Sequence, residues 1–280
     1  MSGDPTVAEQ LIWSLAQEAR SEDVAVVGVA TPIANAAALL ARETLAPGLT
    51  VLAGAAVDPT VHDVARPMVD ASYLSRISAG TLSQLEILDQ IQQGAVTLQY
   101  VSPAQVDGRG RLNTSRVRQP DGTLLRLPGS LATADIAVLV GRLIAYRASH
   151  SPRFLVPKVD FVSGAGHDRG QKWREDRQLP GSGLEAIVTD AAVLRWSAGR
   201  FELESVHEGH DPERVARDCG FELIEPGPSR VTPSPPSDAL DILRKVIDPH
   251  AMRDLEVRAT RRQAVDRLVG LSTSRRSDEW

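Results

Sequence analysis

The sequence contains one cysteine, Cys219, and only three lysines among its 280 residues. A single cysteine excludes an internal disulfide framework, so a reducing compartment, the cytoplasm, is the expected location. The three lysines stand against 28 arginines. This skew indicates a GC-rich genome and says little about function.

Long apolar runs and a large excess of charge are also missing. No stretch approaches the roughly 20 apolar residues of a membrane-spanning helix, and the first residues, MSGDPTVAEQ, do not form a signal peptide. The net charge is −5, so no basic face for nucleic acid dominates. With 42% apolar and 24% charged residues, we expect a globular protein of one or two domains, with neither nucleic acid nor membrane as a partner.

The first quarter of the chain alternates between strand and helix patterns. Val24–Ala30 (VAVVGVA) is apolar throughout, which is typical of a strand buried on both faces. Thr31 and Pro32 have the residue types of an N-cap and a first helical position, and predict a helix over Ile33–Leu45. Leu49–Ala53 predicts a second buried strand. This order indicates an α/β fold with an open, mainly parallel sheet flanked by helices.

Other patterns extend this expectation along the chain. Thr6 and Glu9 have the spacing of a capping box and predict a first helix near residues 7–20. Beyond Leu184, short strands joined by turns indicate a β-rich second half, with a hairpin turn at Ser197-Ala198-Gly199. The remaining predictions are helices over 81–93, 211–220 and 237–247, strands over 95–101, 136–140 and 158–162, a Pro/Ser linker over 226–237 and a helical tail over 251–271.

Several familiar motifs of chemistry are absent. The segment after the first strand is GVATPIA, which has one glycine and a proline where a dinucleotide fold needs close backbone approach. There is no Walker motif and no G-x-S-x-G elbow. These absences exclude the commonest nucleotide-binding and serine hydrolase sites.

Two groups of residues are better explained by a structural role than by catalysis or metal binding. His207 and His210 stand three residues apart in an expected loop, with no third ligand at a usual spacing, so a solvated loop is favoured and no metal site is expected. Cys219 precedes Gly220 and is expected to be a small buried residue at a helix end.

The segment Val162–Asp168 (VSGAGHD) carries two open interpretations. Its glycines follow an expected strand, where backbone N–H groups can approach an anion and His167 can act as an acid or base. The alternative is a flexible connection with an exposed histidine. The residues alone favour neither.

Six segments together resemble the β subunit of the family I coenzyme A transferases, the glutaconate CoA-transferase type, over Val24 to about Arg258. In this sequence they are GVATPIANAAALLARETLAPG (28–48), AQVDGRGRLNTS (104–115), KVDFVSGAGHDRG (158–170), EAIVTDAAVLRW (185–196), DPERVARDCGFEL (211–223) and ILRKVIDP (242–249). The stretch VIDPHAMRDLEVR resembles in particular a branch in actinobacterial steroid degradation, whose members hydrolyse a carbon ring of an acyl-CoA.

The resemblance implies the NagB/RpiA/CoA-transferase-like fold and an active site near a subunit junction. It implies a CoA-transferase-like α subunit as partner, in a heterodimer or heterotetramer, and an acyl-CoA substrate. No cofactor is implied beyond the coenzyme A of that substrate. We expect a domain over 1–249 and an arginine-rich helical tail over 250–280, which can form an arm on the partner.

The departures from the family pattern bear on activity. The transferases carry a nucleophilic glutamate at the end of the second strand, where this sequence has Leu52. Their Gly-Ser-Gly-Gly turn corresponds to Gly129-Ser130-Leu131-Ala132, and added side chains narrow the approach to an oxyanion. In the AQxDxxGNxN stretch, Arg111 replaces an asparagine.

These features give the functional expectation. The chain is expected to be one half of an acyl-CoA enzyme that opens a ring by hydrolysis in steroid or alicyclic catabolism. A genuine CoA transferase using another carboxylate and a non-catalytic structural subunit are the alternatives, and the catalytic residues are left open. The expected substrate-facing residues are Thr31, Leu52, Gly54, Gln105, Asn113, Gly129, Ser130, Gly164 and His167.

Overall fold

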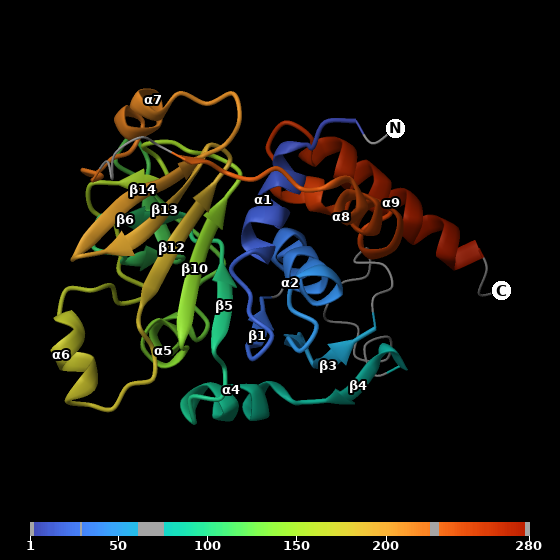
Figure 1. Ribbon diagram of the computed structural model, residues 1–280, viewed down its shortest axis with the longest axis horizontal. Helices are drawn as coiled ribbons and strands as arrows, with labels where there is room; N and C mark the ends of the chain where they lie inside the picture. The colour runs from blue at the N-terminus through green and yellow to red at the C-terminus, as the bar shows by residue number, and fades with distance from the viewer. Residues whose placement is uncertain (1–2, 29, 61–75, 225–229, 278–280) are drawn as a thin grey trace. The chain divides into compact units, whose positions relative to one another are not determined.

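The computed structural model describes residues 3–28, 30–60, 76–224 and 230–277, and the chain in it forms two compact units. Unit 1 comprises Met1–Glu22, Val27–Leu82 and Ser234–Trp280. Unit 2 comprises Asp23–Val26 and Ser83–Pro233. Figure 1 shows the elements of both, coloured along the chain.

Unit 1 is built around helix α2. Helices α1 (Val7–Ala16) and α2 (Pro32–Thr44) pack against each other, because both present buried alanines and leucines. Segments from the end of the chain also pack in this unit (Figure 1): α8 (Ser237–Ile242), the π-helix η1 (Leu243–Ile247), the 3-10 helix η2 (Met252–Glu256) and α9 (Arg261–Ser277). Strands β2 (Thr50–Ala53), β3 (Ala56–Pro59) and β4 (Ser78–Thr81) form antiparallel pairs in chain order.

The starts of α1 and α2 are capped differently. The predicted capping box of Thr6 and Glu9 is confirmed at α1. At α2, Pro32 is the first helical residue as predicted, but the Thr31 hydroxyl donates to the Gly28 carbonyl (2.6 Å) and caps nothing. The Glu256 carboxylate instead accepts from the main-chain N of Ile33 (2.9 Å). A carboxylate at a helix N-terminus also complements the helix dipole.

Unit 2 is organised on a sheet with the order β15-β14-β13-β12-β10-β5-β1. Its strands are β1 (Val24–Val27, the last residue counted in unit 1), β5 (Leu98–Val101), β10 (Arg142–Arg147), β12 (Leu184–Thr189), β13 (Ala192–Ser197), β14 (Arg200–Val206) and β15 (Arg230–Val231). The β1–β5, β5–β10 and β10–β12 pairs are parallel, and β12–β13–β14 is antiparallel. This confirms the predicted mainly parallel α/β sheet with a β-rich second half.

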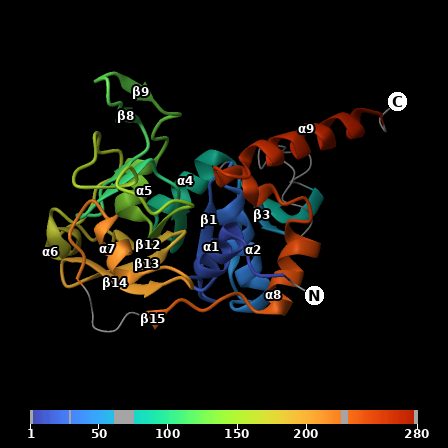
Figure 2. The ribbon, with the colours of Figure 1, turned by 90° about the horizontal axis from the view of Figure 1, so that it is seen from above.

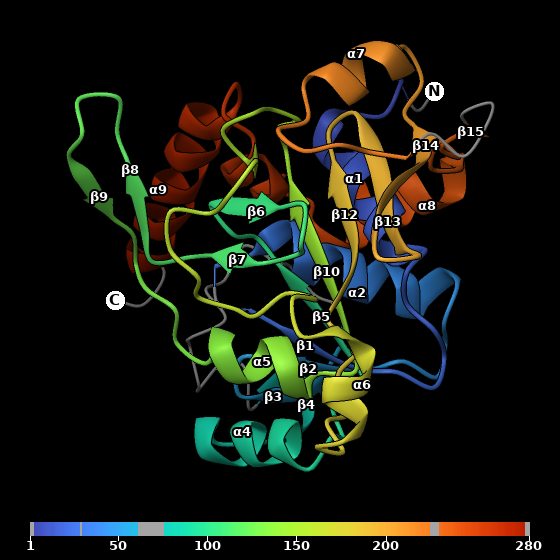
Figure 3. The same ribbon diagram turned by 90° about the vertical axis from the view of Figure 1, so that its left-hand side faces the viewer.

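Smaller elements surround that sheet. Helices α4 (Gln84–Gln92), α5 (Thr133–Leu139), α6 (Gly170–Glu175) and α7 (Pro212–Arg217) belong to unit 2. A second sheet has the order β11-β6-β7, from Leu155–Val156, Gln105–Asp107 and Leu112–Asn113. Strands β8 (Arg116–Arg118) and β9 (Leu124–Arg126) form a hairpin that Figure 3 shows at the edge of the unit.

Two predicted strands are wrong. Residues 136–140 belong mostly to helix α5, where Ile136, Ala137 and Val140 are buried at a helical spacing. A five-residue apolar run does not distinguish the two structures. Residues 158–162 join no sheet, because the main-chain N–H groups of Val159 and Asp160 donate to side chains of β6.

Other predictions are confirmed or stay open. The β13–β14 turn lies at Ser197-Ala198-Gly199 as predicted, with positive φ at Ala198 and Gly199. The expected tail contains η2 and α9, and the expected boundary at residue 249 stays a prediction. Residue 29 of the first strand and residues 226–229 of the expected linker lie outside the described residues.

Candidate functional site

The loop that contains His167 packs along the turn between β6 and β7. The main chains of Leu112 and Gly164 bond each other in both directions at 3.1 Å, and the His167 N–H donates to the Arg109 carbonyl (2.8 Å). A Cβ at Gly166 would lie 2.1 Å from that carbonyl oxygen, so only glycine fits there. The amides of Ser163, Gly164 and His167 thus donate to protein carbonyls.

The His167 ring is enclosed on several sides. It stacks on Trp196 of β13, with ring centroids 3.8 Å apart and planes 8° apart. Gly110 and Gly183, both with positive φ, leave the space that the ring occupies, because a Cβ at either would lie within 3.0 Å of it. Its Nε2 lies 3.0 Å from the Leu184 carbonyl, which only a protonated Nε2 can satisfy.

This environment sets the charge of His167. Burial lowers the pKa of the imidazole, and the nearby Arg174 guanidinium adds to this, while the bond to Leu184 and the charge of Asp168 oppose it. The ring is therefore neutral at neutral pH. Since Nε2 carries the proton, Nδ1 carries the lone pair and is the atom that can accept a proton.

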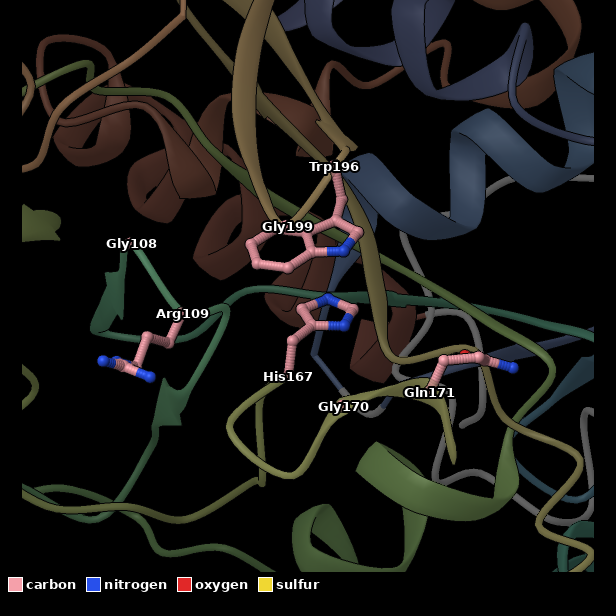
Figure 4. Close-up of a pocket in the computed structure, with 7 residues that line it drawn as sticks. All are labelled: Gly108, Arg109, His167, Gly170, Gln171, Trp196 and Gly199. Atoms are coloured by element: carbon pink, nitrogen blue, oxygen red, sulfur yellow. The ribbon is translucent and has the colours of Figure 1, made fainter. Parts of the chain in front are cut away.

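A cavity of about 540 Å³ opens beside this ring. Figure 4 shows the stacked His167 and Trp196 with Arg109 on one side and Gln171 on the other, and Gly108, Gly170 and Gly199 complete the lining. The Arg109 guanidinium is largely exposed and lies 3.7 Å from the Asp168 carboxylate. The cavity thus combines an anion-binding group, an amide and a proton acceptor.

Gln105 and Asn113 form a buried pair between β6 and β7. The Asn113 side-chain amide donates to the Gln105 carbonyl oxygen and to the Arg116 main-chain carbonyl, both at 2.7 Å. The Gln105 amide donates to Asp160 (2.9 Å), whose main-chain N–H returns a bond to it (3.0 Å). These amides are engaged by the protein, so they position the loops, and contact with substrate stays a prediction.

Three hydroxyl groups meet where the loops of unit 2 converge. The Ser115 hydroxyl hydrogen-bonds those of Ser130 and Ser163, the latter at 2.9 Å. Gly129, just before this cluster, is exposed with a positive φ of 119°. Three expected site residues thus lie on neighbouring segments. Ser130 bonds Ser115, and Gly164 bonds Leu112, which is the neighbour of Asn113 in β7.

The three remaining expected site residues lie in unit 1. Thr31 is half-buried at the start of α2, and Gly54 follows β2 with a positive φ of 61°. Leu52 is a core residue of β2, 4% exposed and paired with Val57 of β3. Their assignment to a substrate site stays a prediction.

A second cavity, of about 350 Å³, was not foreseen from the sequence. Its walls include His150, which follows β10, and Asp190, which follows β12. Ligands frequently bind at the carboxyl ends of neighbouring parallel strands, so this general rule could have pointed to the cavity. Trp196 and Arg109 of the first cavity were also missed, since only the fold brings them to His167.

The described residues contain no group of three or more His, Cys, Asp or Glu side chains placed to hold a metal ion. The expected solvated loop is wrong for His207, which is buried directly after β14 and whose Nε2 bonds the Thr189 carbonyl (2.9 Å). Burial lowers its pKa to about 4.

Cys219 is half-buried, and burial raises its thiol pKa to about 11, which suits an unreactive residue. Across the described part of the chain, no helix has the length and apolarity to cross a membrane.

Comparison with proteins of known function gives consistent results in sequence and structure. The chain is 28% identical over 243 residues to the B subunit of 3-oxoadipate CoA-transferase from Pseudomonas knackmussii, covering 84% of this chain and 91% of that protein. The chain is similar to CoA-transferase β subunits. The predicted resemblance is thereby confirmed. No protein-family model matches the chain.

Other relatives of this CoA-transferase-like chain have different activities in their names. The cholesterol ring-cleaving hydrolase IpdB subunit of Mycobacterium tuberculosis is 24% identical over 267 residues, 91% of this chain and 99% of that protein. Among solved structures, the decarboxylase AibA/AibB matches with a TM-score of 0.77 and 26% identity, over 91% and 99% of the two chains. Glutaconate coenzyme A-transferase of Acidaminococcus fermentans matches with a TM-score of 0.73 and 24% identity, over 87% and 95% of the chains.

Proposed function

We propose that this chain is the β subunit of a heteromeric enzyme that acts on an acyl-CoA and opens an alicyclic ring by hydrolysis, in steroid or alicyclic catabolism. The partner is a CoA-transferase-like α subunit. Similarity to single subunits of a transferase and a hydrolase, and to the two-chain AibA/AibB assembly, supports the partner. Since relatives include a transferase, a hydrolase and a decarboxylase, the reaction must be argued from residues.

The observation that carries the hydrolytic interpretation is Leu52. The resemblance places the nucleophilic glutamate of the transferases at this position, and a buried leucine offers neither a nucleophile nor a titratable proton. The only carboxylate on the β2–β3 hairpin is Asp58. It accepts from the Val51 main-chain N–H (2.7 Å) and lies 3.6 Å from Arg42. Neither residue therefore supports a glutamyl thioester on this chain.

His167 supports water chemistry. A hydrolase needs a group that takes a proton from water. His167 lines a cavity of suitable size, and its neutral ring keeps a lone pair on Nδ1. Arg109 and Gln171 supply the cavity with polar groups for a substrate. We propose His167 as the proton acceptor on this chain.

A genuine CoA transferase remains the second candidate, because the 3-oxoadipate CoA-transferase relative shares 28% identity with this chain. Two experiments separate the candidates. The chain alone and the chain with its α partner are assayed against a panel of acyl-CoAs, and we expect turnover only from the pair. Full activity of the chain alone contradicts the two-subunit proposal.

The second experiment searches for the covalent intermediate. The assembled enzyme is incubated with acyl-CoA and the intact mass of this chain is measured; the bare mass is expected. A CoA adduct that maps to a glutamate or aspartate of this chain would favour the transferase. Leu52→Gln is the control for Leu52→Glu, which restores the nucleophile and is expected to gain the adduct if it folds.

A further inference from the structure

The β8–β9 hairpin projects from the rest of unit 2 (Figures 2 and 3). It forms a two-stranded sheet of its own, and every residue of β9 is exposed. Such a hairpin adds little to a core. Its sequence is therefore free to serve a surface role.

The pairing register places three arginines on one face of the hairpin. Arg116 pairs with Arg126, and Arg118 pairs with Leu124. Because side chains alternate between faces with a period of two, Arg116, Arg118 and Arg126 share a face with Leu124. Directly opposite Cβ atoms are about 5 Å apart, and Arg116 and Arg118 are about 7 Å apart along the strand.

This arginine face is not neutralised within the described part of the chain. None of its three guanidinium groups forms an ion pair there: Arg116 lies over the Phe161 ring (4.5 Å), and Arg118 donates to the Gly122 carbonyl (3.2 Å). The one carboxylate of the hairpin, Asp121, accepts from Thr123 instead. Like charges directly opposite each other destabilise a hairpin. Fold stability therefore does not account for this face.

We propose that the arginine face binds phosphate groups of the coenzyme A part of the substrate, an inference that rests on the proposed function. Coenzyme A carries a diphosphate and a ribose phosphate, which make it a compact polyanion. Guanidinium forks bind phosphate oxygens in pairs, and three arginines whose Cβ atoms lie about 5–8 Å apart on one face suit such a ligand. Leu124, half-exposed on the same face, offers an apolar contact to the adenine ring.

The position of the hairpin fits this role. Its base follows Ser115, whose hydroxyl bonds Ser130 and Ser163 in the loop cluster of unit 2. A ligand whose phosphates lie on the hairpin can thus extend toward those loops. An acidic protein surface is the competing occupant, and the test distinguishes the two.

The test measures binding to the assembled enzyme by titration calorimetry. Coenzyme A and dephospho-coenzyme A are titrated into the wild type, the Arg118→Gln/Arg126→Gln variant and Arg153→Gln, which removes an exposed arginine elsewhere in unit 2. Charge-assisted hydrogen bonds of this kind predict a Kd for coenzyme A that rises about tenfold in the double variant and stays unchanged in Arg153→Gln. The loss for dephospho-coenzyme A is smaller if the ribose phosphate contacts the face.

A structural role predicts a different result. The double variant relieves the repulsion between Arg116 and Arg126 and removes only the exposed bond from Arg118 to the Gly122 carbonyl. Its Tm is therefore expected to stay close to that of the wild type, whereas a structural role lowers it. An unchanged Kd in the double variant overturns the inference. An equal loss of coenzyme A affinity in Arg153→Gln also overturns it, because binding would then depend on the net charge of the protein and not on this face.

The last arms separate this inference from the proposed function. If the double variant separates the subunits on size exclusion while the remaining assembly binds coenzyme A normally, the face binds protein and the inference is wrong. If the variants bind coenzyme A like the wild type and the enzyme still consumes acyl-CoA, only the inference fails. A wild-type assembly that neither binds coenzyme A nor consumes acyl-CoA contradicts the proposed function itself.

Discussion

Arginines in the two units are used in opposite ways. In unit 1, Arg253 bonds Glu9 (2.8 Å) and Asp248 (2.9 Å), and Arg244 bonds Glu9 through two nitrogens (2.8 Å each). The two carboxylates are 1% and 0% exposed. In unit 2, the arginines of the hairpin face are exposed, and their guanidinium groups form no ion pair among the described residues; the Asp160 carboxylate accepts only from the main-chain N–H of Arg118 (2.9 Å).

This difference separates arginines that stabilise the fold through buried ion pairs from arginines that remain exposed to solvent. The network of unit 1 connects α1 to the segments at the end of the chain and pairs both buried carboxylates with guanidinium groups. The Gln105–Asn113 pair of unit 2 is engaged in the same way. The exposed guanidinium groups of the hairpin face, and that of Arg109 in the His167 cavity, are the charged groups that a ligand can reach.

The largest effect is expected from Arg253→Met in unit 1. This change leaves two buried carboxylates without their shared cation and should lower the free energy of unfolding by about 3–5 kcal/mol. Urea unfolding measures it. Arg267→Met, which removes a more exposed partner of Asp254, is the control and should cost about 1 kcal/mol or less. If Arg253→Met also lowers the free energy of unfolding by about 1 kcal/mol or less, the arginines of unit 1 do not stabilise the fold more than exposed arginines do.

The pH dependence of stability tests the same network. Burial by itself raises the pKa of Glu9, but hydrogen bonds from Arg244 and Thr6 and the charge of Arg253 outweigh it and lower the pKa from 4.5 to about 2. The unfolded state therefore binds the proton more readily. The stabilisation is complete above pH 4.5 and is lost as the pH falls toward 2, in total about 3 kcal/mol. Burial raises the pKa of Asp248 in the same network, which contributes a slope of opposite sign. The difference between the wild type and Glu9→Gln, unfolded between pH 5 and 3, should therefore show the Glu9 slope.

A moderate effect is expected at the buried amide pair. Asn113→Ala leaves the Gln105 oxygen and the Arg116 carbonyl with fewer donors and should cost about 1–3 kcal/mol. Gln105→Ala should cost a similar amount, and the double variant less than the two single losses together, because both remove one shared bond. Strict additivity in chemical denaturation would mean that the two amides do not act as a pair.

The smallest effect is expected on the hairpin. Arg126→Gln removes the repulsion with Arg116 and should raise the free energy of unfolding by about 0.3 kcal/mol. Calorimetric melting of Arg126→Gln beside Arg153→Gln measures the difference. A clear drop in Tm for Arg126→Gln alone would show that the hairpin arginines support the fold after all.

Local patterns predicted the fold well. The capping box at Thr6 and the buried strand from Val24 depend on neighbours in sequence, and both appear in the structure. Residues 136–140 failed because a short apolar run fits a strand and a buried helix turn equally. Residues 158–162 failed because side chains of β6, about 50 positions earlier, take their main-chain bonds.

The site was harder to predict, for the same reason. His167 stood out by its glycine-rich loop, but its stacking partner Trp196 and its acceptor Leu184 come from strands farther along the chain. The arginine face depends on the register of β8 and β9, which the turn-rich sequence does not reveal. Leu52 was found by resemblance to a family, not by any property of the residue itself.

The origin of the oxygen in the product tests the central claim most directly. The assembled enzyme is given an alicyclic acyl-CoA in ¹⁸O-labelled water with no free carboxylic acid present. We predict that substrate is consumed, that one labelled oxygen enters the ring-opened acyl group, and that its CoA thioester stays intact. Consumption that requires an added free acid, with CoA transferred to that acid and no label in the acyl chain, would contradict the hydrolytic account and establish the transferase.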